Sequence, residues 1–311
     1  MRTGETEGIT ICYCMQMNIM PGVTSYRRIG IIGSGRVASA LGLALAQLST
    51  EPLAIRGRDP VRCAAAAALI GRAVAIALMT EIAETCDVIV LAVSDDALEQ
   101  SISELAASGG TASSFVFHVS GRSGAAILAP LGLKGWLTAA IHPAMTFTGD
   151  PQAEVRRMIG ARFAVTASTG RSSAAARALV AHLGGVPVDI AEEYRPLYHA
   201  ALCYGANHLV TLVASSCEAL AAAGVDDPAG LLTPLVRAAL ENSLGKGMTG
   251  LSGPLLRGDE ETIAGHISAL REHCPALLPS YRAMGLATLD ALKRLNGTEA
   301  PSPCRPILEK I

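Results

Sequence analysis

A glycine turn near the start of the chain constrains the fold most. An apolar run, residues 29–32, leads into Gly33-Ser34-Gly35, and an alanine-rich segment, residues 38–48, follows. This order predicts a strand, a tight turn and a helix N-terminus, where backbone N–H groups and the helix dipole favour a pyrophosphate. A glycine turn without a ligand is the alternative, because such strings also occur by chance. We predict a dinucleotide site formed by the turn and the residues that follow it: Gly33, Ser34, Gly35, Arg36, Val37 and Ala38.

The end of the next predicted strand, residues 52–55, indicates which dinucleotide binds. The residue at this place normally meets the adenosine ribose, and an acid there bonds the 2′-hydroxyl of NAD. The chain instead reads Arg56-Gly57-Arg58-Asp59. Because guanidinium groups suit a 2′-phosphate, Arg56 and Arg58 favour NADP over NAD. In the alternative, both arginines are solvated loop charges and Asp59 caps the helix that follows.

Length and composition favour two domains that act on a small molecule. The chain has 311 residues, of which 50% are hydrophobic and 17% charged, with a net charge of −2. No basic face is therefore offered to nucleic acid or to a membrane. The eight cysteines are scattered, without metal-ligand spacing or a dense disulfide framework, which fits reduced thiols in the cytoplasm and predicts no metal site. Cys12-x-Cys14 is the one close pair, and we interpret it as incidental.

The strand and helix patterns predict an α/β protein: a doubly wound, mostly parallel sheet followed by an all-helical C-terminal domain. Further strands are expected at residues 74–77, 87–93, 115–119, 136–141, 162–166 and 186–190. Beyond residue 191 the chain becomes helical, with long helices at 196–223 and 228–244. We predict a poorly ordered extension at 1–26, a cofactor domain at 27–190, a helical substrate and dimerisation domain at 191–298, and a loose tail at 299–311.

The long apolar helix at 196–223 calls for burial on several sides, which predicts a homodimer. The strand at 87–93 ends at the edge of the sheet where cofactors bind, so Val93 and Ser94 are further candidates for cofactor contact. For the next two residues, Asp95 and Asp96, we expect a helix cap.

Two polar segments follow predicted strands on the cofactor side. His118-Val119-Ser120-Gly121 and His142-Pro143-Ala144-Met145-Thr146 place hydroxyl and imidazole groups where they could orient a substrate carbonyl. An imidazole can also supply the proton that accompanies hydride transfer. We therefore predict roles for Ser120, His142 and Thr146, whereas His118 is expected to pack within its strand.

On the long helix, His199, Cys203 and Asn207 recur at a spacing of four and share one face. A polar partner should face them, because unpaired buried groups cost about 1 to 3 kcal/mol each. A substrate is one candidate, and backbone or a neighbouring helix is the other. Near the end of the chain, Arg257 in a turn-rich loop could hold a substrate carboxylate, or could pair with Asp259.

These segments together resemble a bacterial family that combines a Rossmann-like half with a conserved helical half and has long been described as of unknown function. The resemblance rests on G-x-G-x-x-A, His-Val-Ser-Gly, His-Pro-x-x-Thr-Phe, the Tyr198-His199 to Asn207 spacing and Ser-Gly-Pro-x-x-Arg-Gly-Asp, and it runs from about residue 27 to 295. The chain is similar in outline to ketopantoate reductase, pyrroline-5-carboxylate reductase and the 6-phosphogluconate and hydroxyisobutyrate dehydrogenases.

The resemblance implies an NADPH-dependent reductase of a small 2-oxo acid, with ketopantoate as the favoured substrate. In several of the related dehydrogenases a lysine four residues before the asparagine transfers the proton, whereas this chain has Cys203 there. The proton must then come from another group, such as His199 or His142, or from water. A non-catalytic NADP(H)-binding protein, a cyclic-imine reductase and a prephenate-dehydrogenase-like enzyme, which the His-Pro segment also resembles, remain alternatives.

Overall fold

The computed structural model describes residues 25–71, 74–110, 114–297 and 302–310, and these divide into two compact units between Leu202 and Cys203. Cys12, Cys14 and nearly all of the predicted extension at 1–26 lie outside the described residues. The helix that contains His199 thus belongs with the first unit, although its sequence predicts a place in the C-terminal domain.

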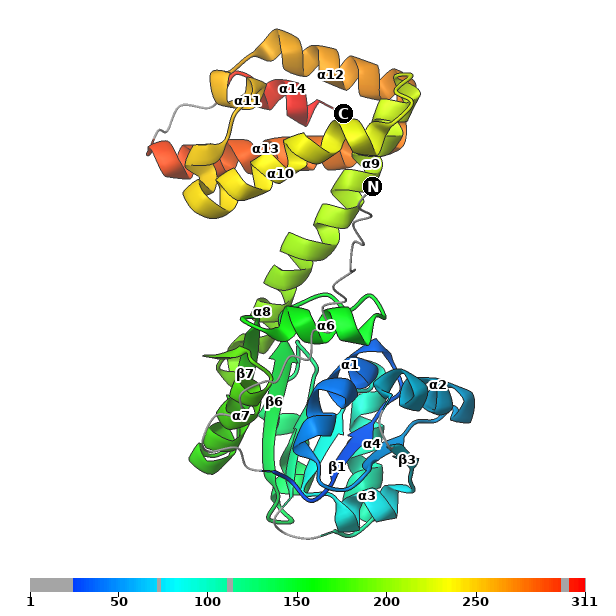
Figure 1. Cartoon of the computed structure of the whole chain (residues 1–311). Coiled ribbons are helices and arrows are strands. Elements are labelled where there is room, and N and C mark those ends of the chain that lie inside the picture. The colour runs from blue at the N-terminus through cyan, green and yellow to red at the C-terminus, as the bar shows by residue number, and fades with distance from the viewer. Residues whose placement is uncertain (1–24, 72–73, 111–113, 298–301, 311) are drawn as a thin grey trace, which may run out of the picture. The chain divides into compact units, whose positions relative to one another are not determined.

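The first unit is built on an eight-stranded sheet in the order β3-β2-β1-β4-β5-β6-β7-β8 (Figure 1). The strands are β1 (Ile29–Ile32), β2 (Leu53–Arg56), β3 (Val74–Ile76), β4 (Val88–Leu91), β5 (Phe115–His118), β6 (Leu137–Pro143), β7 (Arg162–Ala167) and β8 (Val186–Asp189). All neighbours are parallel except β6 and β7, which are antiparallel with His142 opposite Ala164. This is a doubly wound order, and it confirms the predicted fold class and strands.

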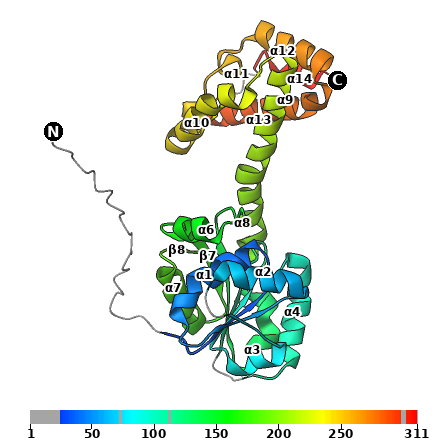
Figure 2. The ribbon, with the colours of Figure 1, turned by 45° about the vertical axis from the view of Figure 1, so that its right-hand side comes forward.

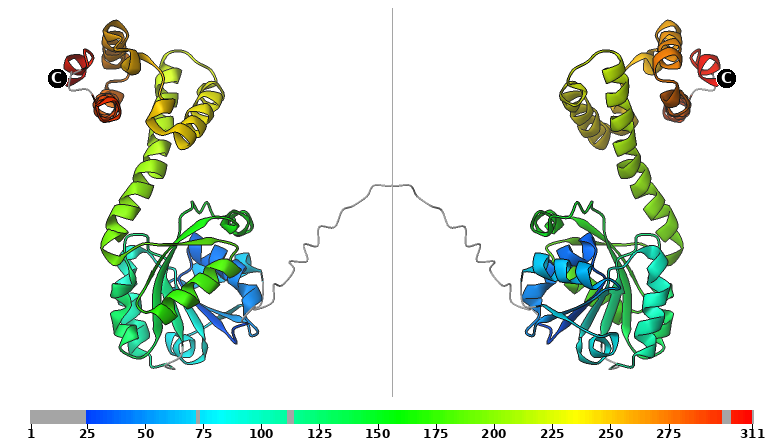
Figure 3. Two further views of the ribbon diagram at one scale, coloured as in Figure 1. Left: turned by 90° about the vertical axis from the view of Figure 1, so that its left-hand side faces the viewer. Right: turned by 90° about the vertical axis from the view of Figure 1, so that its right-hand side faces the viewer.

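Helices cover both faces of this sheet, as the side views show (Figure 3). One face packs on α1 (Arg36–Leu45), α2 (Pro60–Ile70), α6 (Pro151–Met158) and α7 (Gly170–His182). The other packs on α3 (Met79–Thr85), α4 (Asp95–Ala107) and α5 (Ala129–Gly132). Strands β1 and β4 are buried along their whole length, because parallel strands between two helical layers have no solvent face.

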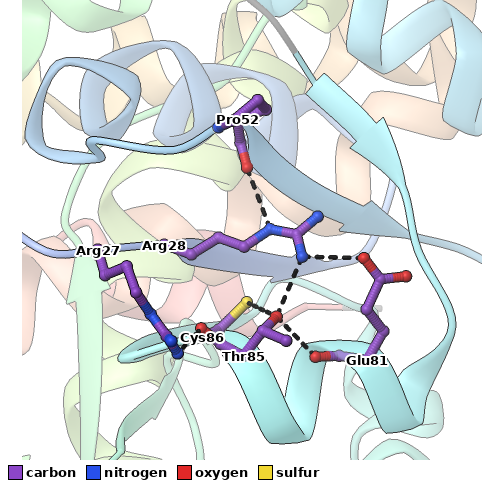
Figure 4. Close-up of polar contacts among 6 residues, drawn as sticks. All are labelled: Arg27, Arg28, Pro52, Glu81, Thr85 and Cys86. Atoms are coloured by element: carbon purple, nitrogen blue, oxygen red, sulfur yellow. Dashed lines mark hydrogen bonds and ion pairs between the residues drawn. The ribbon is translucent and has the colours of Figure 1, made fainter.

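The sheet edge at which β1 begins is held by an arginine network (Figure 4). Arg28 donates to Glu81 Oε1 at 2.9 Å, to Thr85 Oγ1 at 3.1 Å and to the carbonyl of Pro52 at 3.2 Å. Arg27 donates to the carbonyl of Thr85 at 2.6 Å. These bonds fasten α3 to the start of β1 and β2, at the edge opposite the glycine turn.

The second unit is helical (Figure 2). The chain passes from α8 (Arg195–Leu202) through a π-helical segment, η4 (Cys203–Asn207), into α9 (His208–Ala222). The remaining helices are α10 (Pro228–Lys246), α11 (Pro254–Arg257), α12 (Glu260–His273), α13 (Leu278–Asn296) and α14 (Arg305–Glu309). Asp227 and Asp259 cap α10 and α12 through their side chains.

Two details of the sequence prediction are wrong. The predicted tail at 299–311 contains α14, and Cys304 and Leu308 are fully buried against α12 and α13. Pro306 lies in the first turn of this helix and does not disrupt it, because proline suits the first helical turn. Neither Asp95 nor Asp96 caps α4, since Ser94 occupies the N-cap position and Asp95 pairs with Arg122.

The part of the chain that the structure describes contains no helix that combines the length and the apolar character needed to cross a bilayer.

Candidate functional site

The glycine turn between β1 and α1 is shaped by close contact with β4. Gly33 has a φ of 134°, and a Cβ there would lie 2.1 Å from the carbonyl oxygen of Ala92. Glycine alone fits, because both the backbone conformation and the space exclude a side chain. Ala38 on the first turns of α1 is fully buried, as close packing of helix on strand requires.

Gly35 differs from Gly33, because a Cβ at Gly35 would meet no atom within 4 Å. It is the N-cap of α1, and no side chain caps this end. The first backbone N–H groups of α1, on Arg36, Val37 and Ala38, therefore belong to an uncapped helix N-terminus, which is a site for an anion.

A cavity of about 440 Å³ lies over this turn, which is large enough for part of a dinucleotide. Its lining includes these predicted cofactor residues: Gly33, Ser34, Gly35, Arg56, Arg58, Val93 and Ser94. A smaller hollow of about 220 Å³, lined by Arg36, adjoins it and shares Ser34 and Gly35.

The guanidinium groups of this cavity come from the end of β2 and from α2. Arg56 is half-buried, whereas Arg58 and Arg62 are exposed. Asp59 accepts hydrogen bonds from the backbone N–H groups of Val61 and Arg62, so it caps α2 as predicted. The cap that the alternative predicted is thus confirmed, while a phosphate-binding role for Arg56 and Arg58, which line the cavity, stays a prediction. Arg62 is a cavity residue that the sequence analysis missed.

A second group of side chains gathers where β6 ends. His142 Nδ1 lies 2.8 Å from the hydroxyl of Tyr198 on α8. Its ring meets the rings of Tyr198 and His199 edge-on, at centroid distances of 5.7 and 6.1 Å. We call His142, Tyr198 and His199 the histidine cluster.

Gly121, in the loop after β5, closes one side of the histidine cluster. A Cβ at Gly121 would lie 2.5 Å from His199 Cδ2 and 3.0 Å from His142 Nε2. Its φ is outside the left-handed region, so the glycine is required for space and not for its conformation.

The histidine cluster is backed by Arg195, which is fully buried. Its Nε donates to Thr166 Oγ1 at 2.7 Å, and its Nη2 donates to the carbonyls of Ala140 and Ala164 at 3.0 and 3.1 Å. Its guanidinium carbon lies 5.8 Å from the ring centre of Tyr198. Burial lowers the pKa of Arg195 to about 10, which leaves it charged at neutral pH.

His142 is neutral at physiological pH. Burial lowers its pKa to about 4, and the positive charge of Arg195 and the neighbouring His199 add to the effect.

His118 shapes the loop beside the histidine cluster. It is fully buried, its Nε2 lies 2.8 Å from the carbonyl of Gly124, and its Nδ1 accepts from the backbone N–H of Ser120 at 3.1 Å. Burial lowers its pKa to about 4. The expectation that His118 packs within the fold is confirmed.

Ser120 itself is buried, and its hydroxyl accepts a hydrogen bond from the backbone N–H of Ser123 at 3.3 Å, which helps to shape this loop.

Two contacts connect the cavity with the loops near the histidine cluster. Asp95, next to cavity residue Ser94, pairs with Arg122, next to Gly121, at 3.0 Å. Arg36 donates to the carbonyl of Phe147 at 3.4 Å, in the loop that carries the exposed Thr146.

The remaining predicted residues, Asn207 and Arg257, belong to the second unit. Asn207 is exposed at the end of the π-helical segment. Arg257 is exposed at the end of α11 and lines a cavity of about 630 Å³ together with Lys293 and Asn296. Arg257 forms no ion pair with Asp259 within the described residues; Asp259 bonds Thr262 instead.

Comparison with known proteins gives the architecture a context. Residues 18–143 match a Rossmann-like domain, and residues 161–288 match a domain of unknown function, DUF2520. No curated protein matches the sequence.

Several solved structures share the fold. A proposed NADP oxidoreductase from Bacteroides fragilis is 19% identical, with a TM-score of 0.71 over 86% of this chain and 98% of its own. A reductive aminase from Aspergillus terreus, in complex with NADPH and ethyl levulinate, is 16% identical, with a TM-score of 0.61 over 91% and 99%. Pyrroline carboxylate reductase from Plasmodium falciparum, with NADP bound, is 15% identical, with a TM-score of 0.53 over 87% and 96%.

The predicted resemblance to a Rossmann-like family with a helical half of unknown function is confirmed: one part of the chain matches a Rossmann-like domain and another matches DUF2520.

Proposed function

We propose that the chain is an NADP-dependent oxidoreductase that reduces a small carbonyl compound. The observation that carries this proposal is the cavity at the glycine turn, where an uncapped helix N-terminus and three guanidinium groups surround an open space of about 440 Å³. Bound NADPH supplies the hydride of the reaction.

The residues of the cavity fit the two charged parts of this cofactor. Gly35 and the N–H groups at the start of α1 would hold the pyrophosphate, since the missing Cβ leaves room there. Arg56, Arg58 and Arg62 hold the 2′-phosphate, because guanidinium groups bind phosphate through paired, charge-assisted hydrogen bonds.

The histidine cluster is the proposed place of the substrate carbonyl. His142 and His199 supply the hydrogen-bonding groups, while Ser120 shapes the neighbouring loop. Thr146 is a further substrate contact in this proposal. Asn207 and Arg257, on the second unit, stay predictions, Arg257 for binding a carboxylate. The resemblance favours ketopantoate as the substrate.

An imine is the second candidate substrate, because a pyrroline carboxylate reductase and a reductive aminase share the fold. Ketopantoate and 1-pyrroline-5-carboxylate should therefore be tested side by side with NADPH and NADH, and prephenate with NADP⁺ and NAD⁺. Oxidation of NADPH that depends on one of them supports the proposal. Tight NADPH binding with no turnover of any compound would favour the non-catalytic alternative.

Replacement of His199 by Ala tests the place of the substrate. We expect turnover to fall while NADPH affinity stays close to that of the wild type, because His199 lies in the histidine cluster and not in the cofactor cavity. Unchanged turnover would remove His199 from the mechanism.

A homodimer is part of the proposal. Helices α9 and α10 have no buried residue, and large apolar side chains of both are exposed, including Val210 at 70%, Leu235 at 67% and Leu244 at 80%. Apolar patches of this kind are typical of subunit interfaces. Light scattering of the purified protein should give twice the mass of one chain, and Leu235→Glu should halve that mass.

A cytoplasmic location stays a prediction.

A further inference from the structure

The two ring nitrogens of His142 have different surroundings. Nδ1 lies within hydrogen-bond distance of the Tyr198 hydroxyl, at 2.8 Å. Nε2 faces Gly121, at the side where a Cβ would approach it to 3.0 Å. In a neutral imidazole with these neighbours, Nε2 carries the ring proton, and Nδ1 accepts a hydrogen bond from the phenol of Tyr198.

A positive charge lies behind this pair, and the carboxylate that acts on it from a distance is Glu192. Arg195 is fully buried, and its side chain donates to a hydroxyl and to two carbonyls, none of which is charged. Its Nη1 has no hydrogen-bond partner among the described residues, and no carboxylate there forms an ion pair with it. Such a charge disfavours a protonated His142 and favours a negative charge on Tyr198.

We propose that Tyr198 is the positioning residue that supplies the proton of the reduction through His142. The inference rests on the proposed reductase function. Tyr198 donates its O–H to Nδ1, and His142 presents Nε2–H to the carbonyl oxygen of the substrate.

The proton balance of the step closes with these groups, NADPH and one proton from water. Hydride transfer to the carbonyl carbon leaves the electron pair of the C=O bond on oxygen. That oxygen takes the proton of His142 Nε2, and Nδ1 takes the proton of Tyr198 as its O–H bond breaks. The resulting phenolate lies beside Arg195. After the product leaves, Nε2 takes a proton from water and Nδ1 returns its proton to the phenolate, which restores the starting tautomer of His142.

The direction of transfer is favourable, because an alkoxide is a stronger base than a phenolate. Burial raises the pKa of Tyr198, and Arg195 offsets part of that rise. The phenol therefore stays protonated at neutral pH until the substrate oxygen demands a proton. The other charged and titratable groups acting on His142 are His199, Asp95 and His118.

The first test needs no substrate. In protein with ¹⁵N-labelled histidine, His142 should stay neutral from pH 5.5 to 8, with its proton on Nε2 and an accepting Nδ1. Tyr198→Phe should shift the Nδ1 resonance, whereas Tyr194→Phe, an exposed tyrosine on the turn before α8, should not. A cationic His142 at pH 7, or a proton on Nδ1, would overturn the inference.

The second test uses turnover. Tyr198→Phe should lower kcat of the reduction by about a hundredfold, in the range of general acid catalysis, with KM for NADPH nearly unchanged. The solvent deuterium isotope effect on kcat should change with it, which a merely structural loss would not cause. A Tyr198→Phe enzyme with a wild-type kcat and isotope effect would overturn the inference.

The two tests separate this inference from the proposed function. If the wild type binds NADPH but reduces no compound, the proposed function fails. The tautomer measurement still confirms or overturns the Tyr198 to His142 bond on which the inference stands.

Discussion

The cofactor cavity and the histidine cluster lie at the carboxyl ends of strands in one sheet, yet they are built in opposite ways. The cavity is open and basic, and the guanidinium groups of Arg58 and Arg62 in it are exposed. In the histidine cluster, His142 is hydrogen-bonded to Tyr198, and the buried Arg195 lies behind this pair. In a site that binds a charged ligand, the hydrogen-bond donors are left available for that ligand. In a site that transfers a proton, other protein groups hold the donors in place before the substrate binds.

Gly33 should give the largest effect on the cavity. Gly33→Ala places a Cβ 2.1 Å from the carbonyl oxygen of Ala92 at a φ of 134°, so the turn must move. We expect NADPH binding to be lost in a fluorescence titration. Gly35→Ala is the matched control for folding: its Cβ meets no atom, so the melting temperature should be unchanged while NADPH affinity falls. Equal NADPH affinity in Gly35→Ala and the wild type would contradict a pyrophosphate at this turn.

Gly121 provides the corresponding change at the histidine cluster. Gly121→Ala should displace His199 and His142, whose atoms lie 2.5 and 3.0 Å from the new Cβ. Displacements of this size cost about a hundredfold in turnover, and NADPH affinity should be retained. Gly170→Ala at the start of α7, where a Cβ meets nothing, is the control. Loss of NADPH affinity in Gly121→Ala would show that the two sites are not separable.

The pH dependence of stability reports the buried imidazoles. The pKa of His118 is about 4 in the folded protein and near 6.5 in the unfolded chain. The unfolded state therefore binds more protons as the pH falls from 6.5 to 4, and stability is lost across this window. The lowered pKa of His118 accounts for about 3 kcal/mol of this loss in the free energy of unfolding. Above pH 6.5 this contribution to stability is fully present. Urea unfolding at several pH values should show the slope, and His118→Gln should flatten it. An equal slope in both proteins would contradict a buried neutral His118.

Arg58 should give the smallest effect and the most specific one. Arg58→Ala removes one charge-assisted contact to the 2′-phosphate, which is worth about 1.5 to 3 kcal/mol, or roughly ten- to a hundredfold in NADPH affinity. NADH affinity should change little. Arg171→Ala, on the exposed surface of α7, is the control. A parallel loss of NADH and NADPH affinity would place Arg58 away from the 2′-phosphate.

The sheet could be predicted from sequence because its strands are buried on both faces. Val88, Ile89 and Val90 form a continuous apolar run, and parallel strands between helices have this pattern. The glycine turn could be predicted equally well. The requirement for glycine at position 33 depends only on local features, namely its backbone conformation and one close contact.

The histidine cluster could be predicted only in part. His142 and His199 were found from their place at a strand end and on a helix face, but the bond from Tyr198 joins residues 56 positions apart. Arg195 gave no signal at all, because an arginine that binds two strand carbonyls looks like any surface arginine in the sequence. The tail helix was missed for a similar reason, since burial of Leu308 depends on α12 and α13.

The exposure of the cavity arginines affects how easily the coenzyme preference of such a protein can change during evolution. Within the described residues, neither Arg58 nor Arg62 bonds the rest of the fold through its side chain, while Asp59 between them holds α2. Coenzyme preference can therefore drift by single substitutions at little cost in stability. Lineages with this scaffold should exchange one nicotinamide coenzyme for the other far more readily than they alter Gly33.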